Sequence, residues 1–237
     1  MISNKRMRNL RSSIDALEGN TDLAPVQSEQ AVNELLIMIG ASFVLLMQLG
    51  FALLENGLVR PKNSKNILIK NVFDTSVSTI TFWLVGFGLA FGLKDDGDFI
   101  GLDSRFFAAS KFDEMEENYY LMWVFQYSFA TTAATIVSGS LAERTQLPAY
   151  LAFSAFMTGF TYPIAVSWTW GGGWLGDAND EGLGFHDFAG AGMVHILGGV
   201  AGFIGASMVG PRYGMEKNPA KRKNLFDEKE SLEWVKK

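Results

Sequence analysis

Five long stretches without a charged residue are the feature that most limits how this chain can fold. Each contains about 19 to 24 residues, the length that an α-helix needs to cross the hydrocarbon core of a bilayer. The alternative, buried helices of a large soluble protein, fits poorly because uncharged runs of this length recur five times. The runs cover residues 35–54, 75–93, 119–142, about 148–170 and 188–209.

These runs predict an all-α membrane protein with five transmembrane helices in a domain of residues 31–210. We expect residues 1–30 to form a mostly flexible extracellular tail, because they are polar and lack periodicity. Residues 211–237 would form a cytoplasmic connector or tail. Pro163 predicts a kink in the fourth helix. The helices are expected at about residues 33–57, 68–93, 119–142, 147–171 and 186–209.

The charges outside the apolar runs predict the orientation. Basic residues follow the first run at Arg60, Lys62, Lys65 and Lys70, and others follow the fifth run, whereas the two remaining long loops are rich in carboxylates. Basic loops tend to stay in the cytoplasm, so the N-terminus is expected outside. We therefore expect an integral membrane protein, in the plasma membrane, with a cytoplasmic C-terminus.

The composition argues against several classes of function. The chain has no cysteine, which excludes disulfides and thiolate metal sites. Its two histidines, His186 and His195, do not make a metal-ligand set or a catalytic triad, so we predict no metal, no cofactor and no enzymatic activity. The net charge of −5, without a basic stripe, also argues against a nucleic-acid partner.

One segment places two ionisable side chains at the head of the fifth run. Asp187 is suited to cap the helix N-terminus, where a carboxylate accepts backbone N–H groups. His195 lies eight residues later, about 12 Å along the helix and about 80° around it, so direct contact between the two is not expected. An ionisable residue at this depth is a candidate for function, and the alternative is a histidine that only joins packed helices.

Aromatic residues supply the other candidates. Phe125 and Phe129 are four residues apart and therefore share one helix face. They could be ordinary core aromatics, or their rings could close a pore. Trp170 could offer its ring face to a cation, or it could be an ordinary interfacial tryptophan like Trp168 and Trp174.

Other polar and small residues are expected to have structural roles. Glu55 and Glu143 lie at helix ends where they could reach water. Gly198, Gly202 and Ala206 form a small-residue stripe that favours close helix packing.

Several motifs together resemble the ammonium transporter family (Amt/Mep/Rh), in that family's order and over roughly residues 32–215. They are Phe51-Ala-Leu-Leu-Glu-Asn-Gly-Leu-Val-Arg-Pro-Lys-Asn63, Phe125-Gln-Tyr-Ser-Phe-Ala130, Leu141-Ala-Glu-Arg144, Trp170-Gly-Gly-Gly173 and Asp187-Phe-Ala-Gly190 followed by His195. The resemblance implies one half of an inverted-repeat, eleven-helix transporter that assembles as a homotrimer, in which case the second half is missing from this chain.

The resemblance also implies a role for each candidate. Trp170 would recruit the cation, Phe129 would gate the pore with Phe125 lining the approach, and His195 would be a pore histidine. Asp187 would support the outer site without binding the ion directly. The implied function is ammonium or ammonia transport, and the alternative is a non-conducting ammonium sensor on the same scaffold.

Overall fold

The computed structural model describes residues 4–93, 99–115, 118–176 and 183–212, with side chains from residue 29 onward. The chain divides into two units, Met1–Gly40 and Ala41–Lys237, which are described separately. Every regular element in the described ranges is a helix, in agreement with the predicted all-α class. The predicted connector lies outside the described residues after Arg212.

The first helix is longer than the sequence predicted. Helix α1 extends from Asn4 to Leu58, whereas residues 1–30 were expected to be mostly flexible. Once a helix is nucleated over a membrane span, each added residue forms another backbone hydrogen bond, so elongation costs far less than nucleation. Polar residues can therefore continue the helix although they have no apolar periodicity of their own.

Four helical segments in the described ranges are long and apolar enough to cross a membrane: Glu29–Leu58, Pro61–Phe91, Leu147–Trp168 and Ala191–Val209. Helix α4, Tyr119–Leu141, corresponds to the third predicted span. It is 23 residues long and, at 1.5 Å per residue, measures about 34 Å. Its polar side chains, including Gln126, Thr131 and Thr135, are buried within the bundle.

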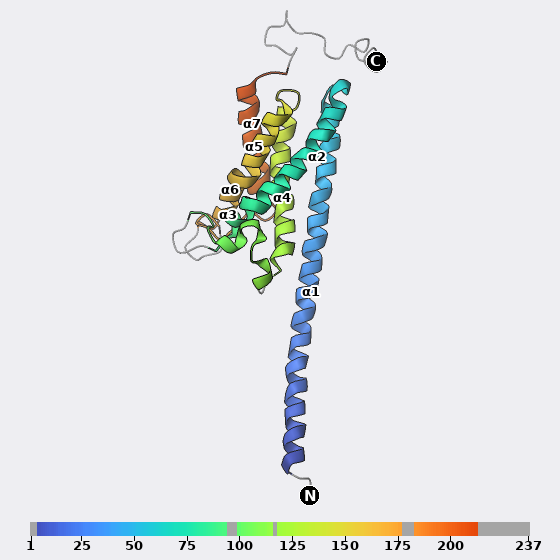
Figure 1. Ribbon diagram of the computed structural model, residues 1–237, viewed down its shortest axis with the longest axis vertical. Helices are drawn as coiled ribbons and strands as arrows, with labels where there is room; N and C mark the ends of the chain where they lie inside the picture. Colours follow the sequence, from blue (N-terminus) through green and yellow to red (C-terminus); the bar gives the residue numbers. More distant parts are fainter. Residues whose placement is uncertain (1–3, 94–98, 116–117, 177–182, 213–237) are drawn as a thin grey trace, which may run out of the picture. The chain divides into compact units, whose positions relative to one another are not determined.

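Helix α4 lies at the centre of the second unit (Figure 1). It packs against α2, Ser64–Thr81, and α7, Leu197–Val209. Helix α2 also contacts α5, Leu147–Phe156, while α3, Phe87–Phe91, contacts α6, Tyr162–Trp168. Three short 3-10 helices also precede α4: η1 (Pro61–Asn63), η3 (Ser104–Ala109) and η4 (Phe112–Glu114).

The glycines of α7 allow its close approach to α4. A Cβ at Gly198 would lie 2.9 Å from the main-chain oxygen of Ala133, and one at Gly202 would lie 2.7 Å from the Ser140 hydroxyl oxygen. Larger side chains at these positions would separate the two helices. The packing role predicted for this part of the small-residue stripe is therefore confirmed.

Within the residues that the structure describes, three π-helical turns interrupt the membrane helices: η2 (Phe82–Gly86), η5 (Met157–Thr161) and η6 (Ala191–Ile196). Pro163 comes just after η5, at the start of α6. The helix adjusts here because proline has no N–H to donate to the preceding turn. The third turn contains His195, one of the candidate site residues from the sequence.

Glu143 ties together three segments at one end of the bundle. Its Oε1 accepts hydrogen bonds from the Arg60 amide (3.0 Å), the Arg60 Nε (2.9 Å) and the Asn63 Nδ2 (2.5 Å). Arg212 lies 3.5 Å from its Oε2. The side chain is only 4% exposed, so Glu143 is not the water-facing helix end that the sequence suggested. Nearby, Arg144 donates to the Gly210 carbonyl at the end of α7 (3.1 Å).

We expect Glu143→Gln to weaken this end of the protein by about 1–3 kcal/mol, because hydrogen bonds to a charged group are lost. Burial by itself raises the pKa of Glu143, but the hydrogen bonds from Arg60 and Asn63 outweigh it and lower the pKa below its usual value. A lowered pKa gives stability that is complete above about pH 4.3, the ordinary value, and is lost as the pH falls further.

Thermal unfolding between pH 3 and 7 should therefore show a flatter acid dependence for Glu143→Gln than for the wild type. Glu114→Gln is the matched control, since the Glu114 side chain is 66% exposed and forms an exposed ion pair with Lys111. Equal acid dependence in the wild type and Glu143→Gln would contradict the proposed role of this carboxylate.

Candidate functional site

Three aromatic side chains, two from α4 and one from the turn after α6, form a continuous cluster. Phe125 and Phe129 of α4 meet edge to face, with ring centroids 5.0 Å apart. Phe129 in turn meets Trp170, with centroids 5.6 Å apart at 62°. All three are half-buried in this chain. The structure thus brings together the three aromatic residues that the sequence singled out.

The indole of Trp170 is held by the segment that precedes the last membrane helix. Its Nε1–H donates a 2.7 Å hydrogen bond to the main-chain oxygen of Asp187. The backbone next to Trp170 is also held: the amide of Gly171 donates to the carbonyl of Val166 at 2.9 Å. The ring position of Trp170 is therefore fixed both by its own backbone turn and by a residue 17 positions later.

The carboxylate of Asp187 caps the last membrane helix, although Asp187 lies several residues before the helix begins. Its Oδ2 accepts the amides of Gly192 (2.9 Å) and Met193 (2.8 Å). The helix begins only at Ala191, with Gly190 as the N-cap in a left-handed conformation (φ +81°). The capping chemistry predicted for Asp187 is present, but its position differs: the chain makes a turn at Gly190 before the helix starts.

The turn at Gly190 joins the cap, the aromatic cluster and the histidine. A Cβ on Gly190 would meet the Val194 side chain at 2.9 Å and the Trp170 ring at 3.3 Å. The carbonyl of Gly190 lies 3.1 Å from Nδ1 of His195. Since a carbonyl can only accept, Nδ1 must carry the hydrogen, which leaves Nε2 of a neutral ring as the acceptor.

His195 is exposed on the surface of this chain, within the π-helical turn. Its ring binds Gly190, whereas the Asp187 carboxylate binds the amides of residues 192 and 193. The two ionisable groups thus have separate partners, as their spacing predicted. Such turns often occur at functional sites because they displace a side chain from the regular helix face.

The arrangement places the face of a tryptophan ring next to phenylalanine rings and near an imidazole. A tryptophan face attracts a cation by about 0.5–2 kcal/mol, depending on how much water is removed. The ring of Phe129 beside it, and the ring of Phe125 next to Phe129, offer no hydrogen bond to a hydrated ion. The imidazole of His195, in the turn that follows Gly190, belongs to the side-chain type that most readily binds and releases a proton near neutral pH.

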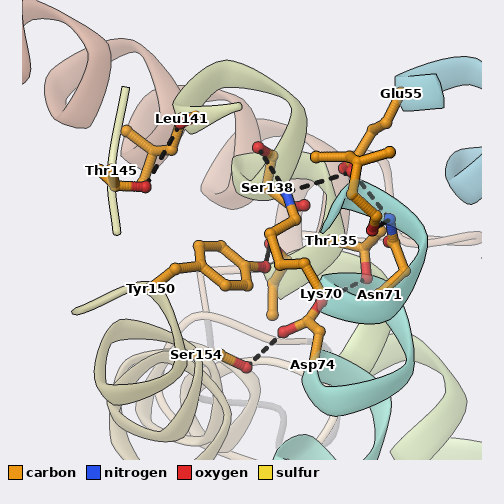
Figure 2. A network of polar contacts seen from close by, with 12 residues as sticks. Glu55, Lys70, Asn71, Asp74, Thr135, Ser138, Leu141, Thr145, Tyr150 and Ser154 are labelled. Atoms are coloured by element: carbon orange, nitrogen blue, oxygen red, sulfur yellow. Dashed lines mark hydrogen bonds and ion pairs between the residues drawn. The ribbon is translucent and has the colours of Figure 1, made fainter. Parts of the chain in front are cut away.

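The structure also reveals a polar network that the sequence analysis missed (Figure 2). Lys70 of α2 is 8% exposed and Glu55 of α1 is 2% exposed; their charged groups lie 3.2 Å apart. Lys70 also donates to the main-chain oxygen of Ser138 at 3.2 Å and lies over the Tyr150 ring, 4.8 Å from its centroid. Asn71 donates to the same oxygen of Glu55, Oε2, at 2.9 Å.

This network corrects two expectations from the sequence. Lys70 was counted among the basic loop residues that set the orientation, but it lies inside α2 and is paired. Glu55 was expected to reach water, but it is buried. One feature of the sequence could have predicted this buried network: Lys70 and Asp74 are four residues apart and therefore lie on one helix face.

A family model described as Ammonium Transporter Family matches residues 35–228. Ammonium transporter 1 member 3 of Solanum lycopersicum is 44% identical over 188 residues, covering 78% of this chain and 40% of that protein. Ammonium transporter 3 of Dictyostelium discoideum is 38% identical over 191 residues, covering 80% of this chain and 42% of that protein.

A solved structure, named Sensor Amt Protein, superposes with a TM-score of 0.72 at 37% identity, covering 86% of this chain and 51% of that one. The chain thus spans about two fifths of the length of the two curated relatives described above. Those relatives are named as transporters, which agrees with the prediction that the chain is not an enzyme. The fold, the apolar helices and a family match over most of the sequence lead to one conclusion: this chain is an integral membrane protein that belongs to the ammonium transporter family.

Proposed function

We propose that the chain is part of a protein that conducts ammonium or ammonia across a membrane. A hydrated ammonium ion would be captured against Trp170, lose water on passing Phe125 and Phe129, and give up its proton before ammonia passes His195. The single observation that supports this most is the contact series Phe125–Phe129–Trp170, tied by the Trp170 indole to the segment that leads to His195.

Each residue has a distinct physical task in this proposal. Trp170 favours a cation through its ring face, without the strong hydration that a carboxylate would retain. Phe129 makes entry depend on loss of water, since its ring cannot replace the ion's hydrogen bonds. His195 has Nε2 as an acceptor while Nδ1 is held by Gly190. Asp187 acts indirectly, by fixing the helix start and the indole.

The surface of α7 supports the proposal that a second half completes the pore. Beside His195, the side chains of Ile196, Val200 and Phe203 are 64%, 51% and 74% exposed. We propose that the inverted second repeat covers this face and supplies the partner of His195, and that the complete protein forms a homotrimer. We also propose a plasma-membrane location, with an extracellular N-terminus and with residues 211–237 in the cytoplasm.

Ammonium uptake by the intact protein in proteoliposomes tests these roles. We expect Trp170→Leu to raise the half-saturating ammonium concentration about 2- to 30-fold, the range that corresponds to the loss of one cation–π contact. Phe129→Ala combined with His195→Ala should change the maximal flux by at least about tenfold, because both the desolvation barrier and the proton acceptor are lost.

Matched controls are available on the same chain. Trp174→Leu removes a tryptophan that is 51% exposed, and Phe160→Ala removes a phenylalanine that is 47% exposed; both should leave uptake within about twofold. Unchanged flux in the Phe129→Ala, His195→Ala double variant would refute the proposed pore mechanism.

A second candidate function is ammonium sensing without conduction, which is favoured by the likeness to the structure named Sensor Amt Protein. Both functions would use Trp170, so Trp170→Leu should weaken binding in either case. They differ in flux: a sensor would bind ammonium in calorimetry while proteoliposomes containing it show no more uptake than empty ones.

A further inference from the structure

Three arginines from separate segments lie at the end of the bundle where α4 stops, together with the ends of α1 and α7 (Figure 1). Arg60 lies between α1 and η1, Arg144 between α4 and α5, and Arg212 after α7. The Arg60 Nε lies 2.9 Å from Oε1 of Glu143, and the Arg212 Nη1 lies 3.5 Å from its Oε2. Arg144 donates to the carbonyl of Gly210, two residues before Arg212. We call these three side chains the arginine cluster.

The positive charge of the arginine cluster exceeds the negative charge that faces it. In the part of the chain that the structure describes, Arg60 and Arg212 share one carboxylate, that of Glu143. The partners of Arg144 there are the main-chain oxygens of Ala206 and Gly210, which carry no net charge. One carboxylate neutralises one guanidinium, so two of the three positive charges have no counter-charge among these residues.

The arginines also keep hydrogen-bonding capacity at the surface. The side chains of Arg60 and Arg212 are 14% and 22% exposed. Arg60 uses its Nε toward Glu143, and Arg212 uses its Nη1 toward Glu143 and the Leu58 carbonyl. A guanidinium carries five N–H donors, so these contacts engage only part of each group. A phosphate is the anion whose oxygens best match the planar fork of such a group.

Apolar side chains with exposed surface flank the arginine cluster. Leu58, whose carbonyl accepts from Arg212 at 3.0 Å, is 57% exposed. Val209, the last residue of α7, is 45% exposed, and Leu147, three residues after Arg144, is 37% exposed. These residues lie at the ends of segments long enough to cross a membrane, where headgroups meet hydrocarbon. A ligand that combines a phosphate with acyl chains fits both features, whereas a free phosphate would use only the arginines.

We propose that the arginine cluster binds the phosphate group of an anionic phospholipid at this surface of the membrane. The phosphate supplies the missing negative charge, and the acyl chains lie against Leu58 and Val209. Glu143 holds Arg60 and Arg212 in place and does not itself contact the lipid. Basic pockets between membrane helices commonly bind anionic headgroups. The proposal uses none of the residues assigned to ammonium conduction, so either proposal can fail without the other.

Lipid binding to the intact wild-type protein in detergent, measured by native mass spectrometry, tests the proposal without a substitution. Phosphatidic acid carries net negative charge, whereas the phosphate of phosphatidylcholine is balanced by its choline. We expect phosphatidic acid to bind about 25-fold more tightly, because each of two uncompensated arginines contributes about fivefold. Glycerol 3-phosphate, the same headgroup without acyl chains, should not compete at equal concentration. Equal affinity for the two lipids would overturn the proposal, and competition by glycerol 3-phosphate would show a site for a soluble phosphate instead.

Substitutions show whether the arginine cluster is the site. Arg144→Gln and Arg212→Gln each remove one positive charge while keeping a polar side chain. Each should weaken binding of phosphatidic acid about fivefold and leave that of phosphatidylcholine unchanged. Lys65→Gln is the matched control: Lys65 is exposed near the start of α2 and lies outside the cluster, so its effect should stay within about twofold in physiological salt. An equal loss in Lys65→Gln would indicate a diffuse basic surface and refute a defined site.

Cross-linking of the wild-type protein keeps the test decisive if an arginine variant does not fold. A phosphatidic acid with a photoreactive group close to its glycerol should label residues near the arginine cluster. Peptide mapping should therefore find the label in residues 56–63, 142–147 or 207–212. Label found only in other segments would contradict the proposal.

Discussion

Lys70→Met is expected to destabilise the protein by about 3–5 kcal/mol, because it leaves Glu55 as a buried charge without its cation. The Lys70 ammonium meets the Glu55 carboxylate at 3.2 Å, and the two side chains are 10% and 2% exposed. The remaining hydrogen bond, from Asn71 to Glu55, cannot neutralise the charge. The effect should be seen as a strong loss of folded protein after extraction in mild detergent, together with a lower melting temperature.

A second substitution separates charge from packing. Glu55→Gln in the Lys70→Met background should recover most of the loss, because the uncompensated charge is then removed. Lys65→Met is the matched control: Lys65 is exposed near the start of the same helix, so its effect should stay within about 0.5 kcal/mol. If the double variant is no more stable than Lys70→Met, burial of an unpaired charge is not the cause.

Gly171→Ala should be the most damaging small change in the Trp170-Gly-Gly-Gly turn. A Cβ at this position would lie 2.1 Å from the main-chain oxygen of Ala90 and 2.9 Å from the Cα of Ser167. Backbone atoms cannot rotate away as a side chain can, so α3, α6 or the turn itself must move. We expect a loss of about 1–3 kcal/mol, the usual cost of overpacking.

The same displacement should disturb the site, because Gly171 is adjacent to Trp170. Gly171→Ala should therefore raise the half-saturating ammonium concentration as Trp170→Leu does. Gly50→Ala in α1 is the control, since a Cβ there has no atom within 4 Å, and alanine is favoured over glycine in a helix by about 1 kcal/mol. Equal melting temperatures and equal uptake for the two alanine variants would contradict this view of the turn.

The length and spacing of the apolar runs were enough to predict the membrane helices, because a bilayer imposes its thickness on any helix that crosses it. The helix starts were less predictable. The second spanning segment begins at Pro61 and the last at Ala191, where positions near 68 and 186 were expected. These limits depend on local turns, such as the left-handed Gly190, which hydropathy does not register.

The aromatic candidates illustrate what a motif can and cannot provide. Sequence reasoning selected Phe125, Phe129 and Trp170, and the structure brings their rings into contact. Sequence reasoning did not predict that the Trp170 indole donates to the main chain of Asp187. That bond joins residues from different segments, so its existence depends on how the helices pack.

By itself, the sequence determined that the chain is helical and membrane-spanning, and its motifs indicated its family and the residues of its candidate site. Those properties depend on composition and spacing along the chain. Only the tertiary structure decided the partners of the buried charges: Lys70 pairs with Glu55, and Asp74 meets Thr135 and Ser154. The physical reason is that a charge inside a bundle is stabilised by groups from other helices, and their approach is set by packing rather than by position in the sequence.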